Sequence, residues 1–126
     1  MNPLWRKATD DAGAAEVLMA AGYTNAAVNR AYYSMFNAAK VALAAIDPKL
    51  ATAKTHASVI RRFGKHVVQE HGFDRSLGRM LSQTEVTRLT ADYAADSVDE
   101  TTARSILDEA RRFLAAVERF LAQTQK

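Results

Sequence analysis

The 126-residue chain contains no cysteine and only two prolines. Without cysteine it has no disulfide framework, no thiolate zinc site and no cysteine nucleophile. Its longest stretch free of Asp, Glu, Lys and Arg covers residues 17–29, which is shorter than the roughly 20 apolar residues that cross a bilayer. The N-terminus also lacks the apolar core of a signal peptide. We therefore expect no membrane contact and a cytoplasmic location.

Several enzyme signatures are absent as well. The sequence has no phosphate-binding glycine loop, no His-Glu-x-x-His helix and no Gly-x-Ser-x-Gly elbow. Its three histidines are His56, His66 and His71; His66 and His71 are five residues apart and would point to different sides of a helix, so they are not spaced to build a metal site from one helix. We expect neither a metal nor a cofactor.

What the chain does contain is helical periodicity. Apolar residues recur every three or four positions, and no stretch alternates as a strand would. The predicted helices cover residues 4–20, 24–46, 55–70, 74–95 and the segment that follows Asp99. Short connections between five helices indicate an all-α, up-and-down antiparallel bundle within a single domain, residues 1–126.

Polar side chains interrupt the apolar pattern of the second predicted helix. Arg30, Tyr33 and Asn37 are three and four residues apart, so they share one face of that helix. This face either forms hydrogen bonds to a neighbouring helix or binds a ligand. The spacing alone leaves both interpretations open, although an interhelical hydrogen bond is the more natural role for Asn37.

Basic residues are concentrated in the middle of the chain. The segment 49–79 contains seven Lys and Arg residues against two acidic residues, whereas the net charge of the whole chain is only +3. Such an excess favours a polyanionic partner, although a solvated helix face explains it equally well. The candidates for contact with a polyanion are Lys54, Arg61, Arg62 and Lys65.

A charged pair lies on the apolar seam of the fourth predicted helix. Leu77, Leu81 and Thr84 continue at helical spacing to Arg88, and Asp92 follows four residues later. A charge on a buried seam costs several kcal/mol unless it is paired or faces a groove. The two residues therefore either form an ion pair that locks the helix in place or line a groove where Arg88 binds phosphate.

Three motifs carry a resemblance to a known family. In order, "AAVNRAYYSMFNAAKVAL" at residues 26–43, "KTHASVIRRFGKHVV" at 54–68 and "RLTADYAAD" at 88–96 resemble the HEPN family of small helical-bundle proteins. The resemblance implies a four-helix up-and-down bundle with an additional short helical element. It also implies a homodimer whose site is lined by the arginine-bearing helix.

The resemblance also suggests an activity. Many HEPN proteins are metal-independent ribonucleases, and some are toxins encoded beside a minimal nucleotidyltransferase. In those members an arginine that steadies the scissile phosphate is followed, a few residues later, by a histidine that moves protons. At that interval after Arg88 this chain has Tyr93, Ala94 and Ala95, and no histidine follows His71. Tyrosine, with an unperturbed pKa of about 10, is a poor base at neutral pH.

The sequence thus predicts a HEPN protein that binds nucleotide or RNA and forms the toxin-like half of a pair with a nucleotidyltransferase. The alternative is a non-catalytic helical adaptor or substrate-binding subunit for that partner. The missing histidine argues against ribonuclease activity unless His56 or His66 approaches Arg88 from another helix or subunit. The candidates for catalysis are Arg88, Asp92 and Tyr93, the last also being the residue that a partner would modify in some relatives. The candidates for RNA or nucleotide binding are Arg30, Tyr33, Asn37, Lys54, His56, Arg61, Arg62 and Lys65.

Overall fold

The structure, a computed structural model, describes residues 2–93 and 97–124, with the side chain of Tyr93 outside the described part. Every regular element in these ranges is helical, which confirms the predicted all-α fold. In chain order the elements are α1 (Pro3–Ala20), α2 (Thr24–Ile46), η1 (Pro48–Thr52), α3 (His56–Arg62), η2 (Phe63–Gln69), α4 (Arg75–Tyr93) and α5 (Glu100–Thr124). The predicted end of the fourth helix, near residue 95, falls outside the described residues.

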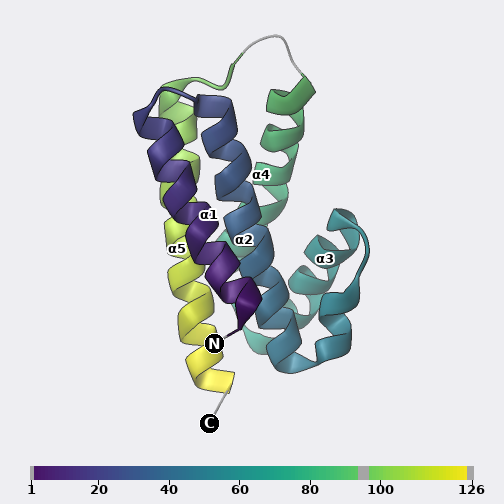
Figure 1. Cartoon of the computed structure of the whole chain (residues 1–126). Helices are drawn as coiled ribbons and strands as arrows, with labels where there is room; N and C mark the ends of the chain where they lie inside the picture. Colours follow the sequence, from purple (N-terminus) through teal and green to yellow (C-terminus); the bar gives the residue numbers. More distant parts are fainter. Residues whose placement is uncertain (1, 94–96, 125–126) are drawn as a thin grey trace.

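Four long helices form the bundle, and the shorter α3–η2 segment lies beside it. In Figure 1, α1 and α5 flank α2 on one side, while α4 and the α3–η2 segment lie on the other. Successive long helices run up and down, so both chain ends lie at the same end of the bundle. This arrangement matches the expected four-helix bundle with an additional short element.

Local sequence signals fix the ends of these helices. Gly22, at φ +88°, adopts the left-handed conformation that terminates α1. The Thr55 hydroxyl accepts a hydrogen bond from the Ser58 backbone N–H and so caps α3. The Asp99 carboxylate accepts one from the Thr102 backbone N–H and caps α5. Thr55 and Asp99 therefore mark the starts of these two helices.

The centre of the hydrophobic core is α2. Tyr32, Met35 and Leu43 of α2 are fully buried, and Phe113 of α5 and Phe63 of η2 are buried with them. Burying a side chain of this size contributes roughly 1.5–3 kcal/mol. The core thus holds α2 in place between α5 and the α3–η2 segment. Within the described residues, no helix is both long enough and apolar enough to traverse a lipid bilayer.

The third predicted helix differs in form from the prediction. It is α-helical only from His56 to Arg62 and continues as the wider π-helical segment η2 from Phe63 to Gln69. η2 packs tightly against α4 at Gly78, where an added Cβ would lie 2.8 Å from Val68 Cγ2. Apolar spacing predicts a helix here, but it does not distinguish a π-turn from an α-turn.

Candidate functional site

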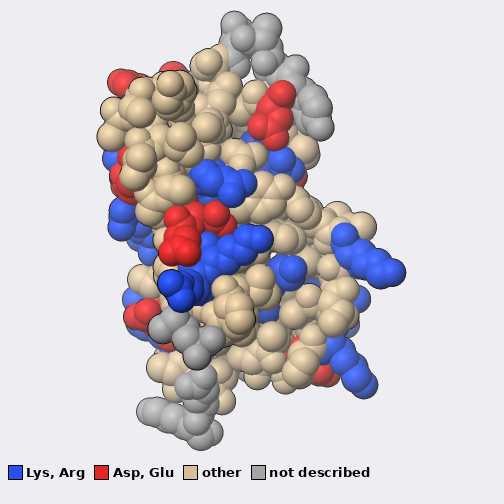
Figure 2. All heavy atoms as spheres, viewed as in Figure 1, with Lys and Arg blue, Asp and Glu red and all other residues tan. Residues whose placement is uncertain are grey.

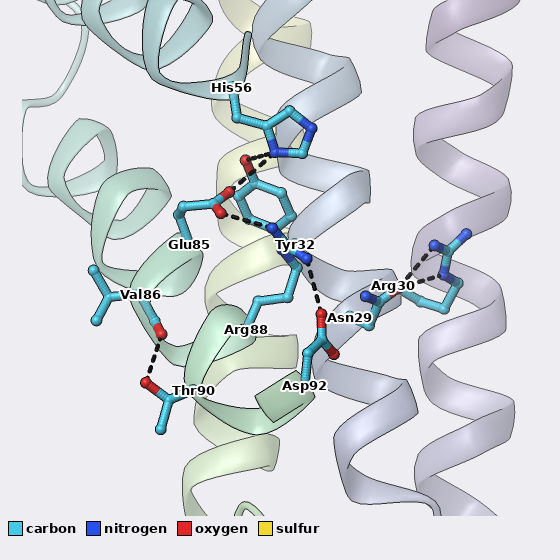
Figure 3. Close-up of polar contacts among 9 residues, drawn as sticks. All are labelled: Asn29, Arg30, Tyr32, His56, Glu85, Val86, Arg88, Thr90 and Asp92. Atoms are coloured by element: carbon cyan, nitrogen blue, oxygen red, sulfur yellow. Dashed lines mark hydrogen bonds and ion pairs between the residues drawn. The ribbon is translucent and has the colours of Figure 1, made fainter. Parts of the chain in front are cut away.

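Arg88 lies on the face of α4 that packs toward α2, and its guanidinium is held between two carboxylates (Figure 3). One guanidinium nitrogen donates to Glu85 Oε1 at 2.7 Å, and the other donates to Asp92 Oδ2 at 2.9 Å. Because Glu85 and Asp92 lie one turn before and one turn after Arg88, helical geometry alone brings the three together. Only 11% of the Arg88 side chain is exposed.

Aromatic rings of α2 form the floor beneath this guanidinium. The central carbon of the Arg88 guanidinium lies 5.1 Å from the centre of the Tyr32 ring and 5.5 Å from that of Tyr33. Arg88 Nε is buried and has no hydrogen-bond partner among the described residues. The electron-rich ring faces help to compensate the charge of a cation taken out of water.

His56, the first residue of α3, joins the same network from a different helix. Its Nδ1 lies 3.2 Å from Glu85 Oε2 and 3.2 Å from the Tyr32 hydroxyl oxygen. The two oxygens of Glu85 therefore connect His56 to Arg88 (Figure 3). We call Tyr32, His56, Glu85, Arg88 and Asp92 the Arg88 cluster.

His66 is not part of the Arg88 cluster. Its Nδ1 lies 2.7 Å from a carboxylate oxygen of Glu70, the residue that follows η2. Of the two histidines that the sequence offered as replacements for the missing one, only His56 is linked to Arg88. Within the described residues, no group of three or more histidine, aspartate and glutamate side chains is arranged to hold a metal ion.

The partners in the cluster set its protonation states. Burial alone would raise the pKa of Glu85, but hydrogen bonds from Tyr32, Arg88 and His56 outweigh it and lower that pKa. For Arg88, burial acts to lower the pKa, and the bond and charge of Glu85 raise it above the ordinary value. Burial and the adjacent carboxylate of Glu85 both raise the pKa of Tyr32. At neutral pH the carboxylate and guanidinium are therefore charged and the phenol is not.

The charges of the cluster do not cancel. Two carboxylates, Glu85 and Asp92, face one guanidinium, which leaves one negative charge when His56 is neutral. A phosphate that approaches Arg88 must therefore displace a carboxylate. Asp92 is the easier one to displace, because 34% of its side chain is exposed against 14% for Glu85. The cluster is thus mostly buried on the Glu85 side and more accessible on the Asp92 side.

Arg30 and Asn37 belong to a second cluster, between α1 and α2. Arg30 donates to Asp11 Oδ1 at 3.2 Å, and the Asn37 amide donates to Asp11 Oδ2 at 3.1 Å. The interhelical hydrogen bond expected of Asn37 is thus present. The Arg30 guanidinium also lies 5.1 Å from the centre of the Tyr33 ring, so Tyr33 has an arginine of each cluster within cation–π distance.

The predicted basic residues lie on or near the α3–η2 segment. Lys54, Arg61 and Lys65 are exposed. Arg62 instead donates to the backbone carbonyl of Leu50 at 3.1 Å, which ties α3 to η1. On the face in Figure 2, Lys and Arg side chains are scattered over this part of the molecule rather than merged into one patch.

Comparison with known proteins agrees with the motifs. The profile of the HEPN domain family matches residues 1–120. The chain belongs to the HEPN family. Its relatives include "Putative toxin MJ0605" of Methanocaldococcus jannaschii, 34% identical over 116 residues, which cover 92% of this chain and 84% of that protein. Another is "UPF0332 protein glr0978" of Gloeobacter violaceus, 28% identical over 122 residues, or 95% of this chain and 94% of the relative.

The HEPN motifs thus converge at one place. The motif at 26–43 supplies Tyr32 and Tyr33, the Thr-His motif supplies His56, and the motif at 88–96 supplies Arg88 and Asp92. Tyr93 is the last residue of α4, and its side chain lies outside the described part of the structure. The basic residues at 54, 61, 62 and 65 are not hydrogen-bonded to the Arg88 cluster in the described part of the molecule.

Sequence reasoning missed two members of the cluster. Tyr32 lies at a position of α2 where apolar spacing predicts burial, and its ring is buried, but its hydroxyl reaches His56. Glu85 received no role, although its position three residues before Arg88 was a signal of pairing on one helix face. Its contact with His56 has no such signal, since it depends on how α3 packs beside α4.

Proposed function

We propose that this HEPN protein binds RNA through Arg88 and is the toxin-like half of a pair with a nucleotidyltransferase. The main observation behind this proposal is that the two carboxylates bound to Arg88 differ in exposure. Glu85 is mostly buried, whereas Asp92 is one-third exposed. An RNA phosphate takes the place of Asp92 on the guanidinium, and Glu85 keeps the guanidinium in position. A planar guanidinium suits such an exchange, because its fork binds carboxylate and phosphate with similar geometry.

The toxin-like role is supported by relatives. Two proteins of Methanocaldococcus jannaschii, 34% and 29% identical to this chain, carry names that describe them as putative toxins. The nucleotidyltransferase partner and the homodimer are inferred from the HEPN resemblance. Val86 and Leu89 are consistent with a dimer, because they are exposed apolar residues of α4, the helix that carries Arg88.

Further contacts to RNA come from the exposed basic residues Lys54, Arg61 and Lys65 on or near the α3–η2 segment. Each phosphate that such a residue neutralises releases counterions, so affinity falls as the salt concentration rises. RNA binding by this protein is therefore salt-dependent, and only part of that dependence comes from Arg88.

The proposal is tested by titrating a labelled RNA oligonucleotide with the protein at about 50 and about 200 mM salt in EDTA. Arg88→Lys keeps the positive charge but loses the planar guanidinium, so we expect the affinity for the RNA oligonucleotide to fall about tenfold. Asp92→Asn removes the competing charge, so we expect tighter binding than in the native protein. Arg104→Ala is the matched control, because Arg104 pairs with Glu16 on the α1–α5 side of the bundle. Unchanged affinity in Arg88→Lys, or no binding at low salt, would contradict the proposal.

The alternative is an adaptor that only contacts a nucleotidyltransferase. The hydrogen bonds of the Arg88 guanidinium favour this alternative, since both of its terminal nitrogens already have carboxylate partners. An adaptor would not bind the RNA oligonucleotide at either salt concentration, and Asp92→Asn would not bind RNA more tightly than the native protein. It would still form a stable complex with the partner enzyme, so the titration separates the two functions.

A further inference from the structure

The position of the His56 proton follows from its neighbours. A ring nitrogen of neutral histidine either donates or accepts a hydrogen bond. His56 Nδ1 faces Glu85 Oε2 at 3.2 Å, and an ionised carboxylate only accepts. An unprotonated Nδ1 would set its lone pair against that charge. Nδ1 therefore carries the proton and donates it to Glu85, and the Tyr32 hydroxyl oxygen at the same distance shares it as a second acceptor.

The other ring nitrogen, Nε2, is then an unprotonated base. In Figure 3 it points away from Glu85 and Tyr32. It makes no hydrogen bond within the described part of the chain, and 36% of the His56 side chain is exposed. A basic nitrogen that is accessible, with the opposite ring nitrogen hydrogen-bonded to a carboxylate, is the arrangement that general-base catalysis requires.

Three aromatic rings of α2 hold the imidazole in this orientation. The centre of the His56 ring lies 4.4 Å from that of Phe36, 5.7 Å from that of Tyr32 and 5.7 Å from that of Tyr33. The first residue of a helix does not need its side chain to be surrounded by aromatic rings in this way. The rings, together with Glu85, fix the imidazole relative to Arg88, and a group fixed in advance is what a catalytic site needs.

We propose that His56 is the proton-transfer residue for RNA cleavage in this protein, in place of the histidine absent after Arg88, with Glu85 as the positioning residue that links it to Arg88. This inference rests on the proposed RNA binding and adds an activity to it. It also accounts for the histidine missing from the motif, because a histidine of α3 takes the place of the one expected on α4.

The substrate is an RNA phosphodiester that has a 2′-hydroxyl. His56 Nε2 takes the proton of the 2′-hydroxyl while its oxygen bonds to phosphorus. The bond from phosphorus to the 5′-oxygen breaks, water protonates that oxygen, and His56 returns its proton to the resulting hydroxide. The products are a 2′,3′-cyclic phosphate and a 5′-hydroxyl, with no net change in protons.

Electrostatics favour the same assignment. Proton uptake by His56 brings the net charge of the cluster from −1 to zero, just as negative charge accumulates on the phosphate. Glu85 stabilises the imidazolium through Nδ1, and Arg88 neutralises the phosphate oxygens. A preorganised pair of cations at the site of developing charge is the largest source of stabilisation in many active sites.

The test uses a DNA oligonucleotide with one internal ribonucleotide and an all-deoxy oligonucleotide as control, both in EDTA. We expect the native protein to cleave only the first, leaving a 2′,3′-cyclic phosphate. His56→Ala should lower the cleavage rate about 100-fold under saturating protein, where RNA binding does not limit the rate. His66→Ala is the matched control, because His66 pairs with Glu70 outside the cluster, and it should cleave as the native protein does.

Glu85→Gln tests the positioning role. The groups that face the His56 imidazole are Glu85 of α4 and Tyr32 and Tyr33 of α2. The amide keeps the shape but loses the negative charge that stabilises the imidazolium formed during proton transfer, so kcat should fall more than KM rises. A purely structural glutamate would lower the amount of folded protein and leave the kcat of the folded fraction unchanged.

The outcomes separate this inference from the proposed function. RNA binding that depends on Arg88, without cleavage by the native protein, overturns the inference and leaves the proposed function in place. Cleavage by His56→Ala at the native rate, or an equal loss in His66→Ala, also overturns it. If His56→Ala fails to fold, as judged by circular dichroism, His56→Gln replaces it, because its amide nitrogen can donate to Glu85 but is not a base.

Discussion

Two arginine clusters flank α2, one on the side of α1 and the other on the side of α3 and α4. In the first, Arg30 reaches Asp11, which also accepts from Asn37. In the second, Arg88 lies between Glu85 and Asp92. From the sequence, each is one arginine that interrupts an apolar helix face. In the structure they differ in burial, in charge balance and in their access to a proton donor or acceptor.

The first cluster has the composition of a structural contact. The Arg30 side chain is 37% exposed, and its charge is balanced by the single carboxylate of Asp11. The second cluster has one carboxylate more than the ion pair needs, and it includes His56. A buried ion pair is rarely worth more to stability than packed apolar residues of the same size. The surplus acid and the imidazole are therefore better explained by function than by folding.

The largest expected difference between the clusters is in stability after loss of the arginine. Arg88→Ala leaves the mostly buried Glu85 without its cation, so we expect the free energy of unfolding to fall by about 3 kcal/mol. Arg30→Ala removes a partner that is 37% exposed, and the buried Asp11 carboxylate keeps its hydrogen bond from Asn37, so we expect a loss of about 1 kcal/mol. Urea unfolding followed by circular dichroism measures both values. Equal losses would mean that the greater burial of Arg88, compared with Arg30, does not strengthen its ion pairs.

The next difference is in the response to acid. The pKa of Glu85 is lowered on folding, so its contribution to stability is present above its ordinary value of 4.5 and disappears as the pH falls through the lowered value. Glu85→Gln should therefore unfold about 1–2 kcal/mol more easily than the native protein at pH 7. The two proteins should converge as the pH falls below the lowered pKa of Glu85. A difference that stays constant with pH would show that packing, and not charge, accounts for the loss.

The fold was predictable because its signals are local. The helix Thr24–Ile46 has the bounds that its apolar stripe predicted, and the caps at Thr55 and Asp99 follow from the side chains there. Each of these signals lies within a few residues of the feature that it determines. The π-helical form of Phe63–Gln69 was missed, because a segment of this length has too few apolar residues to distinguish the period of a π-helix from that of an α-helix.

The candidate site was predictable only in part. The pairing of Arg88 with Asp92 follows from a separation of four residues on one helix. The link from Glu85 to His56 spans 29 positions of sequence and exists only because α3 packs beside α2 and α4. Tyr32 has a double role, since its ring is buried in the core while its hydroxyl reaches the site. Apolar periodicity predicts that the ring is buried but does not predict the contact that the hydroxyl makes.

The carboxylate of Glu109 tests whether hydrogen-bond partners account for the lowered pKa of Glu85. Glu109 of α5 is also partly buried, but no side chain of the described residues hydrogen-bonds to its carboxylate, and burial raises its pKa against the weaker effect of Arg112. A raised pKa means that the charged form opposes folding as the pH rises above 4.5. Glu109→Gln should therefore stabilise the protein by about 0.5 kcal/mol or less at pH 7 and have no effect near pH 3. Thermal unfolding at both pH values measures this effect, whose sign is opposite to that of Glu85→Gln. If Glu109→Gln is destabilising at pH 7, the Glu109 carboxylate has a favourable partner, and burial no longer explains the contrast between the two glutamates.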